Sequence, residues 1–477
     1  KVKSVSANVI NLANHKPENP VSLAGTTGNA YEDYASCYLV PPTAGSYEFP
    51  CTLADGTKLE GGVTAEIKWA EEAGMVYDLH YNPETNKISF KTNGKKGNAL
   101  VVLTNGGQAN NAIIWHWHIW ITDAPKTLKI MGSGSNANVA YYLMDRVLGA
   151  TWVPTSNIET TSTVTLSSQN VAFNNTIALE NANDACGVYF QYQSCNPLPR
   201  IKSLGDKTKE KIETLHNTRC DVMYGFSQYS QYWATSQSAA NIFESTFTEE
   251  GQTLYVHNGI TLPNYEYRAY EGNKDTWNLS NIINQQGKTS PASVVVSEGN
   301  YRLWNSINDN DHDDMMKYKT AHDPCPPGYI MENYSILYWY ATISDAVKAK
   351  FGYARAAEDD ATYKSGYKFY GMYYNGCKDK DDNAVPMYWP CAGNRTSGIT
   401  GVAGQYSNCG YIYVVNTNNT NTYTVASGGK TYTIGNGGAM AFGEVGSNYT
   451  APGLLNPSPK KTVNAQGYNV RCRRGKF

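Results

Sequence analysis

The first quarter of this chain is dominated by short runs in which every second residue is apolar. Ala65, Ile67 and Trp69 form one such run, and polar residues stand between them. A period of two is typical of a strand with one buried face. Turn-forming sequences such as Asn93-Gly94 separate the runs,. Residues from about 30 to 125 therefore predict a sandwich of two antiparallel sheets,.

Two stretches inside this region are more continuously apolar. Residues 100–104 suit a strand that is buried on both faces,. Residues 112–122 predict a further strand that contains three tryptophans and two histidines. Side chains alternate across a strand, so Trp115 and Trp117 are predicted on one face,. The other face would hold His116, His118 and Trp120. Two histidines two apart on a strand could bind a metal, but no carboxylate motif accompanies them, so we interpret them as core or domain-junction residues.

The glycine- and serine-rich segment 132–137 predicts a flexible linker,. It divides the chain into an N-terminal domain, 1–131, and a second domain, 138–477. In the second domain the clearest helix is predicted over 335–351, with an apolar stripe at helical spacing and Gly352 as its stop,. Residues 411–415 and 423–425 are predicted to flank the tip of one hairpin,.

Composition and charge narrow the class of protein. The hydrophobic fraction of 41% indicates a globular chain,. The formal net charge of −2 excludes a positive electrostatic potential over the whole protein, of the kind that attracts nucleic acids or anionic membranes,. No run of about 18 apolar residues predicts a membrane span,. The start, Lys1-Val2-Lys3-Ser4, is not a signal peptide, so we expect that any export used a segment since removed,.

The chain has ten cysteines and no Cys-x-x-Cys pair. Zinc sites normally contain closely spaced cysteine pairs, so a zinc site is disfavoured. We expect disulfides formed in an oxidising compartment, with a metal site or free thiols as the alternative.

Several motifs, taken together, resemble a family of secreted Bacteroidetes proteins. These motifs occur in the same order as in that family and span about 35–472; they include Ser36-Cys37-Tyr38-Leu39-Val40, Leu143-Met144-Asp145-Arg146, Asp323-Pro324-Cys325-Pro326-Pro327-Gly328-Tyr329, Tyr388-Trp389-Pro390-Cys391 and Gly467-Tyr468-Asn469-Val470-Arg471-Cys472. The family comprises fimbrillin-like surface and pilus-tip proteins that carry a Fibrobacter succinogenes major paralogous domain.

The resemblance implies a β-rich α+β fold. An N-terminal antiparallel β-sandwich would precede a C-type-lectin-like mixed α/β domain with long loops. In such a domain the strand at the C-terminus lies near one helix, which implies a disulfide between Cys325 and Cys472. Two further pairs are plausible, Cys391 with Cys409 and Cys186 with Cys195. The family pattern usually lacks these cysteines, so they suggest extra cross-links in loops, and sequence alone does not determine the connectivity.

An aromatic cluster is the candidate ligand-binding site. It comprises Tyr367, Phe369, Tyr370, Tyr373 and Tyr374. Flanking glycines and asparagines predict a loop or short hairpin, where exposed tyrosines would stack on sugar rings or contact a protein. The alternative is that half of these rings belong to a core, because a strand buries one face.

An acidic segment is the candidate calcium site. Asp309, Asp311 and Asp313 place carboxylates at alternate positions, and calcium takes six to eight oxygen ligands,. The segment is not an EF-hand loop, because Asp314 and Thr320 stand where that loop needs Gly and Glu. A solvated acidic loop is the commoner alternative.

Catalytic motifs are absent from the sequence. It has no His-Glu-x-x-His and no Gly-x-Ser-x-Gly,. We therefore predict a non-catalytic adhesin on the cell surface, at a fimbrial tip or as an accessory subunit. The resemblance implies that a neighbouring pilus subunit inserts a strand into the N-terminal domain, and that the C-terminal loops bind a glycan or protein receptor. The implied disulfide would fix the C-terminal strand within its own domain, and only five residues follow Cys472. We therefore expect that this strand is not donated to a neighbouring subunit. The alternatives are a glycan-binding lipoprotein outside a pilus and an enzyme of the formylglycine-generating oxidase type.

Overall fold

A computed structural model describes the N-terminal part of the chain almost continuously and the remainder in segments. The described residues are 19–105, 113–131, 138–153, 161–166, 169–174, 184–190, 195, 197, 304, 319–320, 323–332, 351–355, 369–390, 392, 410–414, 420–424, 431–435, 437–442, 458–462 and 468–475. This part of the chain is β-rich with few helices, and α1 (Ala30–Asp33) is a single short turn. None of the helices in it is long and apolar enough to cross a membrane.

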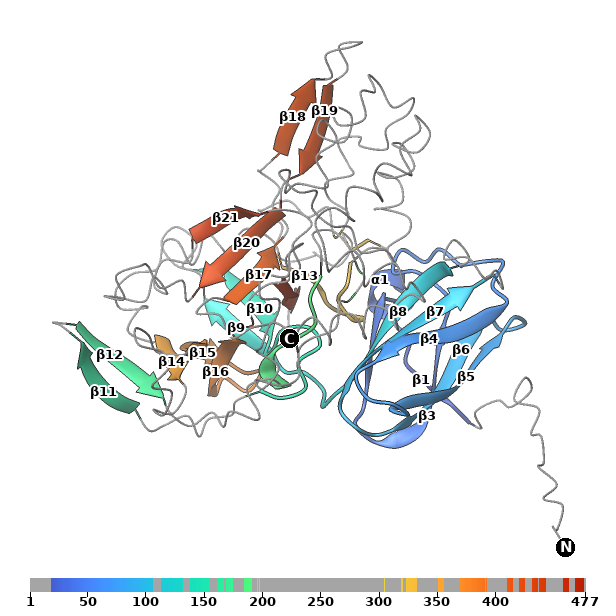
Figure 1. Ribbon diagram of the computed structural model, residues 1–477, viewed down its shortest axis with the longest axis horizontal. Helices are drawn as coiled ribbons and strands as arrows, with labels where there is room; N and C mark the ends of the chain where they lie inside the picture. Colours follow the sequence, from blue (N-terminus) through green and yellow to red (C-terminus); the bar gives the residue numbers. More distant parts are fainter. Residues whose placement is uncertain are drawn as a thin grey trace, which may run out of the picture.

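Two four-stranded sheets form the N-terminal unit (Figure 1). The first sheet has the order β1 (Val21–Ser22), β3 (Ala44–Pro50), β6 (Lys87–Asn93), β5 (Val76–Asn82). The second has the order β2 (Cys37–Val40), β8 (Ile113–Ile121), β7 (Gly97–Thr104), β4 (Thr64–Ala70). One buried core joins them, and in it the Phe49 ring lies 4.9 Å from Tyr38 and 5.2 Å from Trp117.

The two sheets are mixed, which differs from the predicted antiparallel arrangement. β1 pairs with β3 in parallel, and β2 pairs with β8 in parallel. Alternation reports which residues face a core, but it carries no information about the direction of the neighbouring strand. That direction depends on how the chain returns across the sheet.

The strand β7 of the second sheet is buried on both of its faces. Every residue of β7 is buried, as predicted for 100–104. One face belongs to the N-terminal core, through residues such as Val101 and Trp117. The opposite face contributes Leu100, Val102 and Trp120 to a second core, which also contains residues of the C-terminal part. The two parts of the protein therefore share a continuous buried interface.

A nine-stranded sheet is the main element of the C-terminal part (Figure 1). Its order is β11 (Thr161–Leu166), β12 (Gln169–Asn174), β14 (Phe351–Arg355), β15 (Phe369–Lys378), β9 (Thr127–Met131), β10 (Ala140–Met144), β23 (Cys472–Arg474), β13 (Ile330–Met331), and β16 (Ala384–Pro390) also pairs with β15. The first strand of this sheet along the chain is β9, which begins at Thr127, and the last is β23, which lies near the C-terminus.

The predicted division at 131 and 138 falls inside this sheet. β9 and β10 pair antiparallel, with Met131 opposite Ala140. The segment between them, 132–137, lies outside the described residues, but its ends belong to adjacent strands. Gly and Ser suit a hairpin connection as well as a linker, so composition did not distinguish the two. The chain leaves the N-terminal unit between β8 and β9 instead.

Two predicted elements are corrected further along the chain. Most of the predicted helix 335–351 lies outside the described residues, but Phe351 and Gly352 open β14 and do not end a helix. The predicted hairpin is wrong: β17 (Gly410–Val414) pairs with β20 (Gly437–Phe442) and β22 (Asn469–Val470). β18 (Thr420–Thr424) pairs with β19 (Thr431–Gly435), and β21 (Ser458–Thr462) pairs with β20. Each of these strands has a suitable composition, but pairing depends on contacts between distant segments.

Candidate functional site

A buried polar cluster surrounds the C-terminal strand β23. Its centre is an ion pair between Lys319 and Asp323, whose side chains are both 0% exposed and whose Nζ and Oδ1 atoms lie 3.0 Å apart. We call this pair the Lys–Asp clamp. The Lys319 ammonium also donates to the carbonyl oxygens of Cys325 at 2.7 Å and Tyr329 at 2.6 Å. Three acceptors match its three protons.

The Asp323 carboxylate is satisfied in the same way. Its Oδ1 accepts from the Cys325 backbone N–H, and its Oδ2 accepts from the Met331 backbone N–H, each at 2.8 Å. Burial raises the pKa of Asp323 and lowers the pKa of Lys319, while each partner's charge opposes the effect on the other,. Losing either partner would leave an uncompensated charge in a dry site.

A disulfide joins this cluster to β23. Cys325 and Cys472 are bonded, with their Cα atoms 5.8 Å apart, as the family resemblance implied. β23 is an interior strand: β10 pairs with one of its edges and β13 with the other. The C-terminal segment is thus held by backbone pairing on both sides and by one covalent bond.

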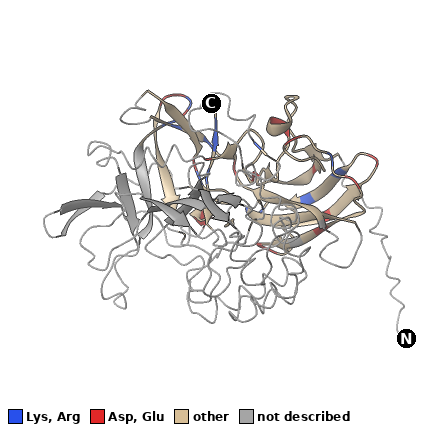
Figure 2. Cartoon of the chain, turned by 90° about the horizontal axis from the view of Figure 1, so that it is seen from above, with Lys and Arg blue, Asp and Glu red and all other residues tan. Residues whose placement is uncertain are grey.

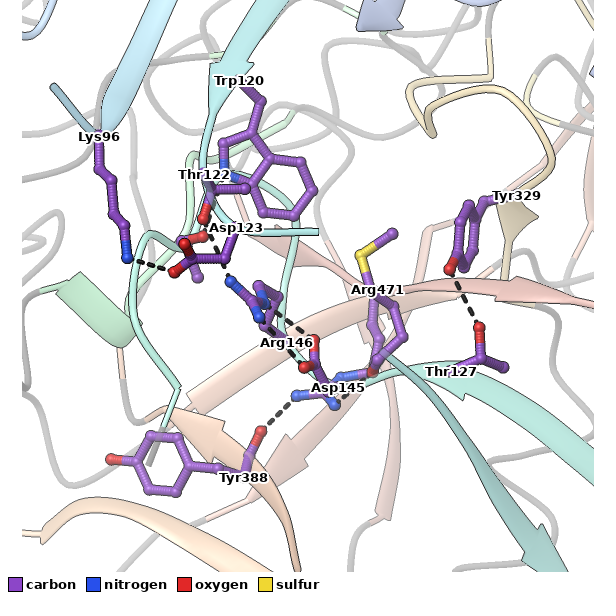
Figure 3. A network of polar contacts seen from close by, with 12 residues as sticks. Lys96, Trp120, Thr122, Asp123, Thr127, Asp145, Arg146, Tyr329, Tyr388 and Arg471 are labelled. Carbon is purple, nitrogen blue, oxygen red and sulfur yellow. Dashed lines mark hydrogen bonds and ion pairs between the residues drawn. The ribbon is translucent and has the colours of Figure 1, made fainter. Parts of the chain in front are cut away.

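Two arginines of the C-terminal segment are buried beside the disulfide. The Arg471 guanidinium donates to the carbonyl oxygen of Tyr388 (Figure 3). It also donates to the carbonyl oxygen of Met144 and lies 4.8 Å from the centre of the Trp389 ring. Arg473 forms an ion pair with Glu332 at 3.1 Å. Guanidinium groups suit such positions because they combine several fixed donors with a flat face that stacks on aromatic rings.

A further arginine connects the sheet to the N-terminal unit. The Arg146 guanidinium binds Asp145 through two hydrogen bonds and donates to the Thr122 hydroxyl at 3.1 Å (Figure 3). Thr122 follows β8 directly, so this contact spans the two parts. Elsewhere in the described part of the chain, basic and acidic residues are both present along the strands and turns (Figure 2).

The histidines of β8 lie at the junction between the two parts and are buried, as predicted. His116 Nε2 lies 3.0 Å from the Cys195 carbonyl oxygen, and His118 Nε2 lies 2.9 Å from Asn98 Oδ1. Asn98 donates through Nδ2 to Gly149 and Glu71, so its Oδ1 accepts and His118 Nε2 donates,. Among the described residues no cluster of three or more His, Cys, Asp or Glu side chains could hold a metal.

His118 makes stability depend on pH. Burial lowers the pKa of His118 to about 3, whereas an unfolded histidine has a pKa of about 6.5. Between these values the unfolded chain binds a proton that the folded chain does not, so stability falls as the pH is lowered below about 6.5. At pH 5 we expect a loss of about 2 kcal/mol from this group alone.

Urea unfolding at pH 7 and pH 5 measures this loss. His118→Gln keeps a donor toward Asn98 but has no titrating ring, so the difference between the two pH values should shrink by about 2 kcal/mol. His80→Gln, on the edge strand β5, removes a histidine away from the junction and serves as the control. An unchanged pH dependence in His118→Gln would show that the His118 ring is charged in the folded protein.

The aromatic segment was predicted as a loop or a short hairpin, and its described part is a strand with antiparallel partners. Tyr367 lies outside the described residues, whereas Phe369, Tyr370, Tyr373 and Tyr374 belong to β15. β15 pairs with β14 on one side and β16 on the other. The composition, rich in Gly and Asn, suggested a loop, but aromatic residues at this density also suit an interior strand.

The register places two of these tyrosines within the sheet. Tyr373 lies between Gly352 and Tyr388, and Tyr374 lies opposite Met387 on β16. Both β16 neighbours, Met387 and Tyr388, are buried. The pairing places both positions inside a sheet, and the ligand-binding role of their side chains stays a prediction.

The candidate calcium ligands Asp309, Asp311 and Asp313 lie outside the described residues. A second acidic segment, at the turn between β15 and β16, is described. There Lys378 and Lys380 form ion pairs with Asp382 and Asp381. Asp379 accepts hydrogen bonds from the backbone of residue 381 and from Asn383. These carboxylates are occupied by side chains and backbone of the same turn.

One predicted disulfide is wrong, and another is outside the described residues. Cys186 and Cys195 are not joined. They pack into different cores, Cys186 with the C-terminal part and Cys195 with the N-terminal unit. Cys391 and Cys409 lie outside the described residues.

Burial also governs the thiols outside the disulfide. Burial raises the pKa of Cys37 and Cys377, and it raises the pKa of Cys51 and Cys195 to about 12. A thiol with a raised pKa is a poor nucleophile near neutral pH, because the thiolate is the reactive form. These four positions therefore suit structural packing.

The sequence interpretation missed the Lys–Asp clamp and the buried arginines. A sequence signal for the clamp exists, since Lys319 stands four residues before Asp323 in the motif that contains Cys325. That spacing is also typical of exposed pairs on helices, so it does not indicate burial. Comparison with known proteins finds no matching family model, no similar curated protein and no similar solved structure.

Proposed function

We propose that this protein is a non-catalytic adhesin of the cell surface, which caps a pilus or serves it as an accessory subunit. The observation that carries this proposal is the position of the C-terminal strand. β23 is paired on both edges and is bonded to Cys325 through Cys472. A strand held in this way is not available for insertion into the sheet of another subunit. Such a subunit would accept a strand from a neighbour without donating this one.

The N-terminal unit supports the accepting role. β1, at the edge of the first sheet, is only two residues long, and it meets β3 only at Tyr47 and Glu48. The Val21 side chain on β1 is 60% exposed. An edge that is covered by so short a strand suits pairing with a strand from a partner. The partner in this proposal is a neighbouring pilus subunit outside the cell.

The C-terminal part would bind the receptor, a glycan or a protein. In this proposal it has the C-type-lectin-like architecture, with long connections between the strands of the nine-stranded sheet. The aromatic segment remains the proposed contact, through Tyr370 and Tyr373 in the first half of β15. The acidic residues Asp309, Asp311 and Asp313 would supply calcium ligands if recognition depends on calcium.

A glycan array probed with the oxidised protein, once with calcium and once with EDTA, tests the receptor-binding role. We expect binding, and we expect Tyr370→Ala/Tyr373→Ala to weaken it about tenfold or more, since stacking on two rings is worth a few kcal/mol. Tyr77→Ala is the matched control, because Tyr77 is 44% exposed on the N-terminal unit.

The calcium arm separates the two candidate sites. Binding lost in EDTA and in Asp309→Asn/Asp311→Asn/Asp313→Asn would place recognition at the acidic segment. Binding that survives EDTA but not the tyrosine substitutions would place it at the aromatic segment. A blank array would contradict glycan recognition and leave a protein receptor.

A further inference from the structure

The Lys–Asp clamp holds the backbone on both sides of the disulfide-forming Cys325. The Asp323 carboxylate accepts a hydrogen bond from the Cys325 backbone N–H, and the Lys319 ammonium donates one to the carbonyl oxygen of Cys325. The clamp also reaches β13, because Asp323 Oδ2 accepts from the Met331 N–H at 2.8 Å. One carboxylate thereby fixes the position of Cys325 relative to β13.

The register of β13 then defines where Cys472 lies. Met331 is the residue directly opposite Cys472 in the antiparallel pairing of β13 with β23. The Asp323 carboxylate therefore accepts hydrogen bonds both from Cys325 and from Met331, the residue opposite Cys472. The resulting Cα separation of 5.8 Å lies in the range that a disulfide needs,.

Other cysteines compete for the same position. Cys37 and Cys186 belong to the same buried core as Cys325 and Cys472. The Lys319 ammonium also interacts electrostatically with the thiols of Cys37 and Cys195, which come from other parts of the chain. If the chain collapses before the backbone at Cys325 has a defined geometry, several other thiols lie near Cys325 and can form a non-native disulfide with it.

We propose that Lys319 and Asp323 are positioning residues that direct the disulfide, so that Cys325 pairs with Cys472 and not with Cys37, Cys186 or Cys195. All the hydrogen bonds of the clamp join residues that are at most ten positions apart. Such local contacts form with little loop-closure entropy, before distant strands are in place. The geometry at Cys325 is then established when β23 arrives.

The chemistry is ordinary thiol–disulfide exchange with a small-molecule disulfide as the oxidant. One cysteine thiolate attacks the oxidant and releases its first thiol, which leaves a mixed disulfide on the protein. The second cysteine thiolate then displaces the remaining small thiol and closes the protein disulfide. Two protein thiols are oxidised and one small disulfide is reduced to two thiols. Burial afterwards raises the pKa of Cys37, which slows exchange with the finished bond,.

Oxidative refolding of the full chain tests the proposal. The reduced protein is refolded in a glutathione redox buffer, free thiols are alkylated, and disulfides are mapped by peptide mass spectrometry. In Lys319→Met/Asp323→Asn both charges are removed, so no buried charge is left alone. We expect the yield of the Cys325–Cys472 pair to fall about fivefold, and mixed pairs with Cys37, Cys186 or Cys195 to appear.

Two further variants separate directed pairing from general misfolding. Lys378→Met/Asp382→Asn removes a pair at the same spacing that is exposed, and it should keep the wild-type disulfide. Adding Cys37→Ser/Cys186→Ser/Cys195→Ser to the clamp variant should restore the Cys325–Cys472 yield, because the three competing thiols are then gone. Wild-type pairing in the clamp variant would overturn the proposal. So would a failure of the competitor substitutions to restore the native pair.

Discussion

Replacing both cysteines of the disulfide, in Cys325→Ala/Cys472→Ala, is expected to lower the free energy of unfolding by about 4–5 kcal/mol. The bond closes a loop of 147 residues. In the chain-entropy account, a loop of that length restricts the unfolded chain by this amount. Because both cysteines are replaced, neither Cys325 nor Cys472 is left as an unpaired thiol that could form a new disulfide.

Urea unfolding under oxidising conditions measures the effect. The wild-type protein unfolded in the presence of a reductant should approach the double variant, since both lack the cross-link. Cys51→Ala is the matched control, because Cys51 is buried in the N-terminal core and lies outside the disulfide. It should cost about 1 kcal/mol through lost packing. A double variant no less stable than Cys51→Ala would contradict the prediction.

Lys319→Met is expected to destabilise the protein by about 3–5 kcal/mol, because the Asp323 carboxylate is then buried without its counter-charge. Lys319→Met/Asp323→Asn should be less damaging than the single change, since neither charge remains. The two single changes should therefore be strongly non-additive, with a coupling of about 2 kcal/mol in a double-mutant cycle. Lys378→Met, in an exposed pair at the same spacing, should change stability by less than about 1 kcal/mol,.

The single variant should also show a characteristic dependence on pH. Burial raises the pKa of Asp323 above its unfolded value, and removing Lys319 takes away the charge that opposes this shift. A carboxyl group with a raised pKa favours the folded state while it is protonated and loses that contribution as the pH rises. The stability difference between Lys319→Met and the wild-type protein should thus be larger at pH 7 than at pH 4. A difference that does not change with pH would show that Asp323 keeps a compensating partner.

Local pattern was sufficient to predict several strands of the N-terminal unit. The runs that end at Trp69 and at Thr104 correspond to β4 and β7. The single buried face predicted for the first run is wrong, because a register shift between Ile67 and Trp69 turns Trp69 to the second core while Ala65 packs on the N-terminal core. The strand β8 was predicted together with the face that each tryptophan occupies, because side chains alternate across a strand whatever its neighbours are,. The Cys325–Cys472 disulfide was anticipated from a family resemblance and not from spacing.

Pairing between distant segments was beyond local pattern. Residues 132–137 had the composition of a linker, yet β9 and β10 on either side of them are neighbours in one sheet. The aromatic segment from Phe369 onward had the composition of a loop, yet it lies between β14 and β16. Glycine, asparagine and tyrosine are compatible with both settings, so only the contacts of the folded chain distinguish them.

The candidate site shows the same division. The amino-acid sequence by itself determined which residues can be strands, which faces are apolar and which charges stand close along the chain. The tertiary structure alone decided that Lys319 and Asp323 are buried beside a disulfide while Lys378 and Asp382, at the same spacing, are exposed. The reason is physical: local periodicity depends on backbone geometry within a few residues, whereas burial depends on which distant segments pack over a site.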